Sequence, residues 1–583
     1  MELTLKAHNI YDFTCADGDY TVTATIEPTD GIDLIRIGFK SASPMIPPVM
    51  KLAWEIPHID VQGIWHPSAH TGRGLPPVWG GGWDSNTTFS APICTIFSSG
   101  GKNRQTFACS DAMNKVRYKF ALREEDSCYE CSVKLFDEII APLDTYSCDI
   151  RVDFRDIRYE DSIAEVTEWW ANMPEYKPMD VPEECISPVY STWYSFHQLA
   201  YGGEIEEVLA SAAPLGFRSV IVDDGWQMED SARTYAYTGD WEVSPQKIPD
   251  MRKHVENVHK MGMKYFLWYS VPFVGKYSKA YETFKGKYFG NGDTVVLDPR
   301  YPEVREYLIG KYENAVKDWD LDGFKLDFID NFRQPEKENP DAAPGRDYDS
   351  VPQAVDRLMT DIKTRLTSLK PNICIEFRQY YMGPLMRKYG NMFRAADCAT
   401  DTVCNKVRIC DLRLTVGNSP AHCDMLTWNV NETVEAAALQ LESTMFAVPQ
   451  ISVRPNNLPE SHNKMLKNWL DFWRDHRDTL LFGKFRAHNP ELLYSQASAE
   501  DENCFAAVAY ANDIIMTDAE GDPAERVFVN ASGARGINLR VKPGTYNVKA
   551  QSCTGDILFE KTEEISGIAA YDVPVAARIT LTK

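Results

Sequence analysis

Gly323-Phe324-Lys325-Leu326-Asp327-Phe328-Ile329-Asp330 is the stretch of sequence that decides the fold. Its apolar residues alternate as in a buried strand, yet a lysine and an aspartate lie between them. Burying two such charges costs several kcal/mol unless each is paired or used. Barrel enzymes place their active-site residues at the C-terminal ends of parallel strands. The stretch therefore predicts a barrel strand that carries Lys325 and Asp327 into an active site.

In a second stretch, charged residues again accompany an apolar run. The apolar run Ser219–Val222 ends in the adjacent carboxylates Asp223 and Asp224, followed by Gly225 and Trp226. Adjacent carboxylates accept hydrogen bonds from neighbouring hydroxyl groups. Together with the first stretch, they indicate a sugar pocket.

From Pro188 onward, apolar runs alternate with helical patterns, which predicts a (β/α)8 barrel. No G-x-G-x-x-G turn follows the first run, and this disfavours an open dinucleotide-binding sheet. The predicted strands are Val189–Phe196, Ser219–Gly225, Lys264–Val271, Gly323–Ile329, Ile373–Arg378, Phe393–Cys398, Ala421–Leu426 and Gln450–Arg454. The predicted helices include Glu204–Ala213, Lys253–Met261, Glu303–Trp319, Val351–Leu369, Glu432–Phe446 and a closing helix near Lys464–Arg474.

The barrel is flanked by two regions of predicted β structure. Up to about residue 180, short stretches alternate with period two between Gly, Pro and Asp turns, and the pattern returns after Phe485. We predict a multidomain protein: an N-terminal β-sandwich (1–183), a catalytic TIM barrel (184–484) and a C-terminal antiparallel β-sandwich (485–583). The Pro-, Asp- and Gly-rich stretch Asn331–Ser350 is an expected active-site loop.

Composition excludes several classes of partner. A net charge of −23 without a basic tract argues against nucleic acid and polyanions, so a neutral ligand is favoured. Together with the predicted sugar pocket, this makes a small-molecule carbohydrate the expected partner. No signal peptide and no run long enough to span a bilayer are visible. The 14 cysteines are mostly isolated, which is typical of free thiols in a cytoplasmic protein.

Unusual polar residues recur at the C-terminal ends of the predicted strands. Taken singly, each has a structural explanation; His422 and Asp424, for example, pair with one another in one interpretation. As a set on one rim they favour catalysis. Besides those already named, they are Trp268, Glu376, Arg378, Arg394, Asp397, His422 and Asp424.

Glycoside cleavage needs an anionic and a protonated carboxyl group. Lys325 keeps Asp327 ionised, which suits a nucleophile. Asp397 is the better general acid if Arg394 points elsewhere, and Asp401 is either its rival or a charge that raises its pKa. Trp268 is a candidate for stacking on the apolar face of a sugar.

Short motifs in register across residues 188–485 resemble the α-galactosidases of glycoside hydrolase family 36, the melibiases, and more distantly family 27. The motifs are Trp193-Tyr194-Ser195, Val222–Trp226, Gly239-Asp-Trp241, Leu267-Trp268, Lys325-Leu-Asp327, Phe393–Asp397 and Phe472–Arg477. The family also carries a β-sandwich before its barrel and a smaller β domain after it.

The resemblance implies a retaining mechanism with Asp327 as nucleophile and Asp397 as acid/base. It implies that Asp223 and Asp224 bind O4 and O6 of galactose and that Lys325 binds O3 and O4. It further places Tyr194 and Arg394 against the substrate, with Trp65 reaching in from the N-terminal domain. It implies neither a metal ion nor a cofactor, and it is compatible with a homo-oligomer.

The predicted fifth strand departs from the family pattern. Many members have a Cys-Ser or Gly-rich turn here, whereas this chain reads Ile375–Gly383. Glu376 and Tyr380, four residues apart, resemble the galactose-selective turn of family 27, and their bulk disfavours an N-acetyl group at C2. Arg378 either pairs with Glu376 or reaches toward the leaving group.

The leading hypothesis is therefore an exo-acting α-galactosidase on small oligosaccharides. A second keeps the pocket but makes the protein a transglycosylase of the raffinose-synthase type or an α-N-acetylgalactosaminidase. A third is a non-catalytic sugar-binding protein, which the presence of both Asp327 and Asp397 disfavours.

Overall fold

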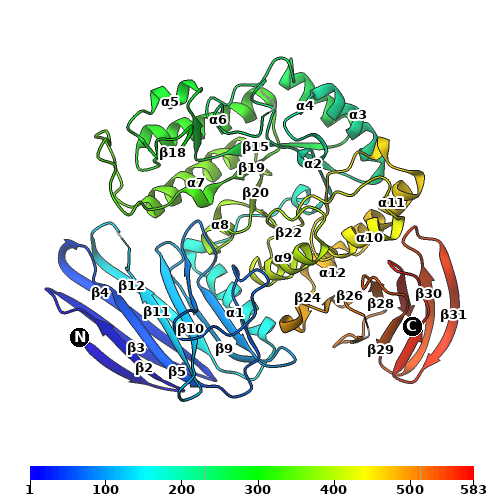
Figure 1. Cartoon of the computed structure of the whole chain (residues 1–583), viewed down its shortest axis with the longest axis horizontal. Helices are drawn as coiled ribbons and strands as arrows, with labels where there is room; N and C mark the ends of the chain where they lie inside the picture. The colour runs from blue at the N-terminus through cyan, green and yellow to red at the C-terminus, as the bar shows by residue number, and fades with distance from the viewer. Residues whose placement is uncertain (139, 230–231, 513) are drawn as a thin grey trace.

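The computed structural model describes residues 1–138, 140–229, 232–512 and 514–583. A parallel barrel forms its centre, with β-sheets formed by the chain before and after it (Figure 1). This is the predicted fold class. The boundaries at 183/184 and 484/485 stay predictions.

Two six-stranded antiparallel sheets precede the barrel and share one hydrophobic core, in which Trp54 of one sheet packs edge-on against Phe107 of the other. The first sheet runs β1 (Glu2–Lys6), β2 (Ile10–Cys15), β5 (Met50–Pro57), β11 (Cys128–Leu135), β10 (Val116–Arg123) and β7 (Gly82–Ser85). The second runs β3 (Tyr20–Thr29), β4 (Ile32–Met45), β12 (Leu143–Asp153), β9 (Asn103–Cys109), β8 (Ile93–Phe97) and β6 (Gly63–Trp65).

Helix α1 (Tyr159–Ala171) corrects the prediction of β structure up to about residue 180. Its buried residues Tyr159, Ile163, Val166 and Trp170 recur at helical spacing and join the core of the barrel. The period-two pattern thus ends with β12, before the predicted limit.

All eight predicted barrel strands are present and pair in parallel. Each is shorter than its predicted range, and several polar rim residues, among them Asp223, Asp397 and Asp424, lie in the loops that follow the strands. The strands are β13 (Val189–Ser191), β14 (Ser219–Val222), β15 (Lys264–Ser270), β19 (Gly323–Asp327), β20 (Cys374–Arg378), β21 (Met392–Arg394), β22 (Ala421–His422) and β23 (Gln450–Ile451). Bridges His422–Val448 and Leu426–Ile451 close the barrel.

Helices surround these strands on the outside (Figure 1). They are α2 (Trp193–Phe196), α3 (Gly202–Ala212), α4 (Met251–Lys260), α5 (Lys279–Thr283), α6 (Pro302–Trp319), α7 (Val351–Leu369), α8 (Pro384–Tyr389), α9 (Thr402–Thr415), α10 (Val434–Glu442), α11 (Glu460–Asp475) and α12 (Arg477–Phe482). The connection between β15 and β19 also holds a small sheet of β16 (Phe273–Gly275), β18 (Thr294–Leu297) and β17 (Tyr288–Phe289).

The loop after β19 contains neither helix nor strand from Phe332 to Ser350, as predicted. Buried arginines fix its course: Arg300 donates to Glu338 at 2.8 Å, and Arg305 pairs with Asp347. These ion pairs fix the path of the loop that follows β19.

The C-terminal region is a seven-stranded sheet packed against a three-stranded one. Two strand pairs, β26–β28 and β27–β29, are parallel within an otherwise antiparallel arrangement. The large sheet runs β24 (Lys484–His488), β25 (Gln496–Glu500), β26 (Cys504–Ala509), β28 (Glu525–Asn530), β33 (Arg578–Thr582), β30 (Gly544–Gln551) and β31 (Ile557–Ile565). The small one contains β27 (Ile515–Met516), β29 (Ile537–Arg540) and β32 (Ile568–Tyr571).

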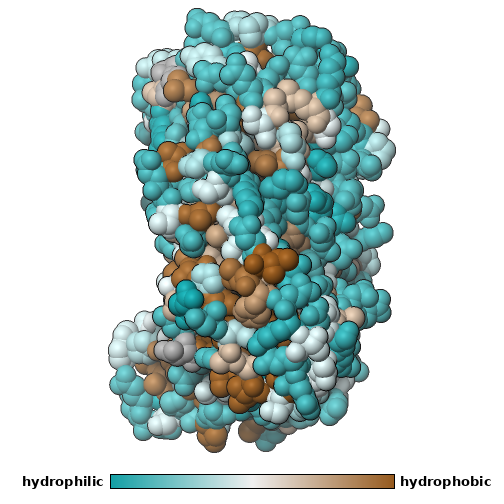
Figure 2. Space-filling model, turned by 90° about the vertical axis from the view of Figure 1, so that its right-hand side faces the viewer, coloured by the Kyte–Doolittle hydropathy of each residue, from teal (hydrophilic) through white to brown (hydrophobic). Residues whose placement is uncertain are grey.

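Most of the surface seen from the side of the C-terminal sheets is hydrophilic, with apolar residues gathered in the lower half of the view (Figure 2). Within the described part of the chain, no helix combines the length and apolarity needed to cross a bilayer.

Candidate active site

The rim residues predicted from the sequence come together at the C-terminal ends of adjacent strands. Asp223 follows β14, Lys325 lies within β19 and Asp327 ends it, and Arg378 and Arg394 end β20 and β21. The register pairs Arg378 with Arg394, so two cationic side chains lie next to each other on adjacent strands.

Asp327 is the most heavily hydrogen-bonded carboxylate of this rim. Its Oδ1 accepts from Arg378 Nε at 2.7 Å, from the Tyr381 hydroxyl at 3.0 Å and from the Phe328 backbone N–H at 2.8 Å. Its Oδ2 accepts one bond, from Trp268 Nε1 at 3.0 Å. Four donors hold the carboxylate in one orientation.

These donors and nearby cations decide the charge of Asp327. Burial alone raises the pKa of the carboxyl, but the charges of Arg378 and Lys325 and the Trp268 hydrogen bond hold it well below its usual range. Asp327 is therefore anionic at neutral pH. The predicted ionisation is right, but its main cause is Arg378 rather than Lys325.

Lys325 has a different direct partner. Its Nζ donates to Asp223 Oδ2 at 2.6 Å, and both side chains are buried. Beside them, Asp224 accepts from Gln198 at 3.0 Å and from Gln227 at 2.7 Å. Burial raises the pKa of Asp224 to about 6. The aspartate pair and the lysine thus form one polar wall.

Arg394 is the centre of a second group. One Nη donates to Asp397 Oδ1 at 3.0 Å and the other to the buried Asp424, whose Oδ2 accepts from the Tyr194 hydroxyl at 3.0 Å. Asp397 is predicted to be the better general acid on the condition that Arg394 points elsewhere. Arg394 instead donates to Asp397, so this condition is wrong. The alternative interpretation, in which His422 and Asp424 pair with one another, does not fit either, because His422 Nε2 faces the Cys185 carbonyl at 2.8 Å.

Asp397 reaches into solvent, with 63% of its side-chain surface exposed. Partial burial raises the pKa of its carboxyl, but the charges of Arg394 and Lys325 lower it by more. The like charge that acts on Asp397 comes from Asp327. Asp401 has another role: it caps helix α9 by accepting from the Cys404 N–H at 2.9 Å.

Glu376 and Tyr380 have different partners, and their predicted effect on an N-acetyl group at C2 stays a prediction. Glu376 is buried, accepts from Gln450, and has its Oε1 3.6 Å from Arg394 Nε. Burial raises the pKa of Glu376 to about 7. The Tyr380 hydroxyl contacts His70 of the N-terminal region instead. Arg378, expected to pair with Glu376 or reach outward, pairs with Asp327.

Neither Trp268 nor Trp65, the two tryptophans predicted to contact the sugar, has an exposed ring face. Trp268 is 2% exposed and directs its indole N–H to Asp327, with Tyr235 stacked beside it. Trp65 is fully buried and donates to Asp411 of α9 at 2.8 Å, so it does not reach the pocket.

Sequence reasoning missed three polar contacts of the site. Tyr381 follows the predicted fifth strand, where a pair of tyrosines is a visible but unspecific signal. Gln198 and Gln227 hold Asp224 from loops, and no periodicity marks them.

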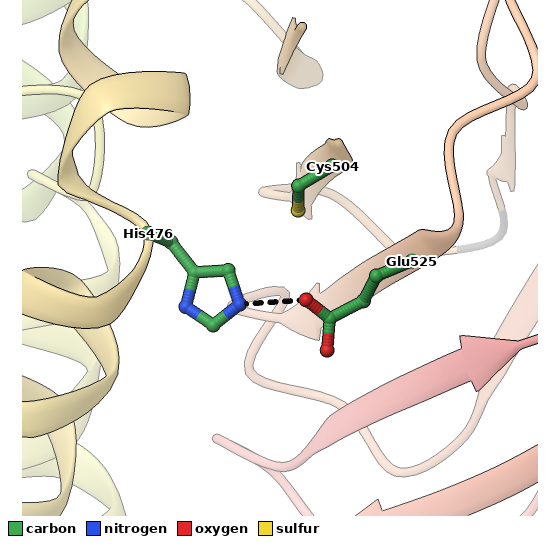
Figure 3. A group of neighbouring side chains, drawn as sticks. All are labelled: His476, Cys504 and Glu525. Atoms are coloured by element: carbon green, nitrogen blue, oxygen red, sulfur yellow. Dashed lines mark hydrogen bonds and ion pairs between the residues drawn. The ribbon is translucent and has the colours of Figure 1, made fainter. Parts of the chain in front are cut away.

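One group with metal-ligating side chains occurs among the described residues, far along the chain from the rim: His476, Cys504 and Glu525 (Figure 3). Both nitrogens of His476 face oxygen acceptors, the Phe472 carbonyl at 2.8 Å and Glu525 at 3.0 Å. Burial lowers the pKa of His476, and the bonds to Glu525 and Phe472 raise it by more. An imidazolium with two acceptors has no lone pair for a metal, so we interpret the group as an ion pair.

The fold of a parallel barrel with β-sheets before and after it is similar to that of solved α-galactosidase structures. The galactosidase domain of the α-galactosidase–sucrose kinase AgaSK matches with a TM-score of 0.66 and 12% identity, covering 98% of this chain and 82% of that one. The family 36 α-galactosidase AgaA of Geobacillus stearothermophilus matches with a TM-score of 0.64 and 16% identity, covering 100% and 82%. At these identities the likeness shows the fold.

Sequence comparison shows the family. The Melibiase family profile matches residues 189–483, just over half of the 583 residues, and the chain belongs to this family.

Curated relatives are distant. A type blood alpha-D-galactosamine galactosaminidase of Flavonifractor plautii is 24% identical over 188 residues, 28% of this chain and 16% of that protein. AgaA is 23% identical over 171 residues, 26% and 22%. The matched segments thus span less than a quarter of these relatives.

Proposed function

We propose that the protein is a retaining exo-α-galactosidase that removes terminal α-galactosyl residues from small oligosaccharides. The observation that carries the proposal is the Asp327 carboxylate, kept anionic by Arg378 and held by four donors. A second carboxyl, Asp397, lies near enough for the charge of Asp327 to raise its pKa. Retaining glycosidases use two such groups about 5–5.5 Å apart.

The chemistry follows from the hydrogen bonds of each oxygen. Oδ1 of Asp327 accepts three bonds and Oδ2 only one, so Oδ2 is the better nucleophile. Oδ2 attacks the anomeric carbon while Asp397 gives its proton to the departing glycosidic oxygen. Water, deprotonated by Asp397, then cleaves the glycosyl ester and restores Asp327.

Asp397 must be protonated in the first step, although Arg394 lowers its pKa in the free protein. A bound sugar removes water from the carboxyl, which raises the pKa, while the anionic Asp327 disfavours a second negative charge. Arg394 donates to Oδ1 only, so Oδ2 is free to carry the proton. Substrate binding thus produces the protonated form of Asp397, which acts as the general acid.

The polar wall selects the sugar. Asp223, Asp224 and Lys325 supply two acceptors and a cation beside Asp327, suited to O4, O6 and O3 of a galactose ring. Gln198 and Gln227 hold the Asp224 carboxyl group in place for this contact. Recognition of the terminal galactose hydroxyls by this wall is the basis of the proposed exo-action.

The direct test is hydrolysis of p-nitrophenyl α-galactoside by the purified protein. We expect turnover with retention of configuration, and a covalent adduct on Asp327 when a fluorinated galactoside is used. Asp327→Asn is the matched variant, since it preserves size but removes the negative charge. No turnover by the parent, or equal turnover by the variant, would contradict the proposal.

A second candidate is an enzyme for α-linked galactosamine. One relative is named as a galactosaminidase, and Tyr380 turns away toward His70 instead of joining Glu376. Parallel assays with p-nitrophenyl galactoside, galactosaminide and N-acetylgalactosaminide rank the three sugars by kcat/KM. Product analysis with raffinose, with and without added acceptor sugar, separates hydrolysis from glycosyl transfer.

A further inference from the structure

A cavity of about 420 Å³ lies away from the barrel rim. It is bordered by helix α1, by the C-terminal ends of α8 and α9, and by the start of β24. Arg387 of α8 and Arg413 of α9 line it and are only 3% and 7% exposed. Two almost completely buried cations thus share one hollow.

Neither arginine has a carboxylate partner among the residues that the structure describes. Arg387 Nη1 makes a long contact of 3.5 Å to the Thr167 carbonyl, and Arg413 Nη2 donates to the Gly483 carbonyl at 3.3 Å. The Nε of each has no hydrogen-bond partner. Burial lowers the pKa of each guanidinium to about 10, so both stay charged at neutral pH.

The acidic residues of the lining are already engaged, except one. Glu160 pairs with Arg158 at 2.7 Å, and Asp161 pairs with Arg486 at 2.7 Å. Glu168 lies exposed at the border of the cavity and makes no ion pair within the described chain. The buried arginines therefore outnumber the free carboxylates around them.

The backbone carbonyls at the helix ends do not offset the missing negative charge around the two arginines. Both arginines lie in the last turns of their helices, where backbone carbonyls attract a cation. This attraction is much smaller than the cost of burying an unpaired charge. A counter-ion from outside the chain would offset that cost.

We propose that this cavity binds an oxyanion of the phosphate class, either free or as the ester of a small sugar. The planar guanidinium fork matches phosphate oxygens, which is why arginine is preferred at such sites. The cavity is larger than one phosphate group, and Leu414 and Phe485 provide apolar walls for the carbon skeleton of an ester. No residue of the candidate active site lines it.

The experiment measures binding to the full-length protein by calorimetry and by thermal melting. The probes are inorganic phosphate and glucose 6-phosphate, with glucose as the uncharged control. We expect phosphate or its ester, but not glucose, to raise the melting temperature by a few degrees at saturation. A response to phosphate alone assigns the free anion; a response only to glucose 6-phosphate assigns the ester.

Arg387→Met and Arg413→Met remove one buried charge each. We expect both variants to melt no lower than the parent without ligand, and their Kd for the anion to rise about tenfold or more. Glu168→Gln should lower the Kd, because it removes the remaining negative charge. Arg357→Met is the matched control, since Arg357 donates to Asp361 on the exposed surface of α7.

Absence of binding by both phosphate probes, or an unchanged Kd in both arginine variants, overturns the proposal. Equal weakening in Arg357→Met overturns it too, because the interaction would then be a general charge effect. Hydrolysis of p-nitrophenyl α-galactoside is measured alongside on every variant. We expect it to be unchanged, which keeps this test separate from that of the catalytic function.

Discussion

Lys325 and Asp327 lie two residues apart on one strand, so their side chains leave the same face. Even so, Lys325 turns to Asp223, which follows β14 on the far side of β15, while the adjacent strand β20 on the other side supplies Arg378 to Asp327. Strand alternation thus predicts which side chains enter the pocket. It does not predict which partner each takes, because that depends on the adjacent strands and loops.

Arg378→Met should move the acid limb of the pH profile. Arg378 holds the pKa of Asp327 down, so its removal raises that pKa. Activity needs anionic Asp327 and is lost as the pH falls through this pKa. The variant should therefore lose kcat/KM at a higher pH than the parent. Arg333→Met, at a nearby exposed arginine, is the control, and an unshifted acid limb in Arg378→Met would show that another group sets it.

Asp397→Ala should discriminate between leaving groups. Loss of a general acid costs about 10²–10⁴-fold when the leaving group needs a proton. p-Nitrophenolate needs little protonation, so its release from the enzyme should suffer far less than that of the sugar leaving group of raffinose. Rates of the first turnover on both substrates measure the difference. An equal loss on both would reject Asp397 as the acid.

Helix α9 connects the rim to the rest of the molecule, and its first turn is built by Asp401. The side chain of Asp401 accepts from Cys404 N–H, as an N-cap does, while Asp397 four residues earlier points toward Arg394. Four residues therefore separate a structural carboxylate from a candidate catalytic one. Residue type alone could not distinguish the two.

Asp401→Ala should reduce stability without selecting between substrates. Loss of an N-cap costs about 1 kcal/mol. We expect the free energy of unfolding to fall by this amount in denaturant titration, with activity on p-nitrophenyl galactoside and raffinose changing in parallel. Thr433→Ala, which removes the N-cap of α10, is the matched control. A loss confined to raffinose would instead assign acid/base work to Asp401.

Among the elements, the eight barrel strands could be predicted because their apolar runs and breaks are local properties. Trp65, Glu376 and Trp268 show the limit of such reasoning. Each is a residue type found in sugar pockets, but their surroundings come from distant parts of the chain: Asp411 for Trp65, Gln450 for Glu376 and Asp327 for Trp268. Those contacts depend on packing, which a local pattern does not encode.

At the scale of the whole molecule, Asp411 of α9 joins three regions. It accepts from Trp65 of β6 at 2.8 Å, from Arg73 of the following loop at 2.9 Å, and from the Tyr494 hydroxyl beyond β24 at 2.6 Å. Asp411 is fully buried and Arg73 nearly so. The N-terminal sheets, the barrel and the C-terminal region thus meet at one buried cluster around the Arg73–Asp411 ion pair.

Asp411→Ala should uncouple these regions. It leaves the Arg73 guanidinium buried without a counter-ion, and such a loss costs about 3–5 kcal/mol. We expect a lower melting temperature and a calorimetric transition that separates into more than one step. Asp149→Ala is the control, because its pair with Arg36 lies on the surface, where ion pairs contribute about 0–1 kcal/mol. If both variants melted alike and as cooperatively as the parent, the Asp411 cluster would not be what couples the three regions.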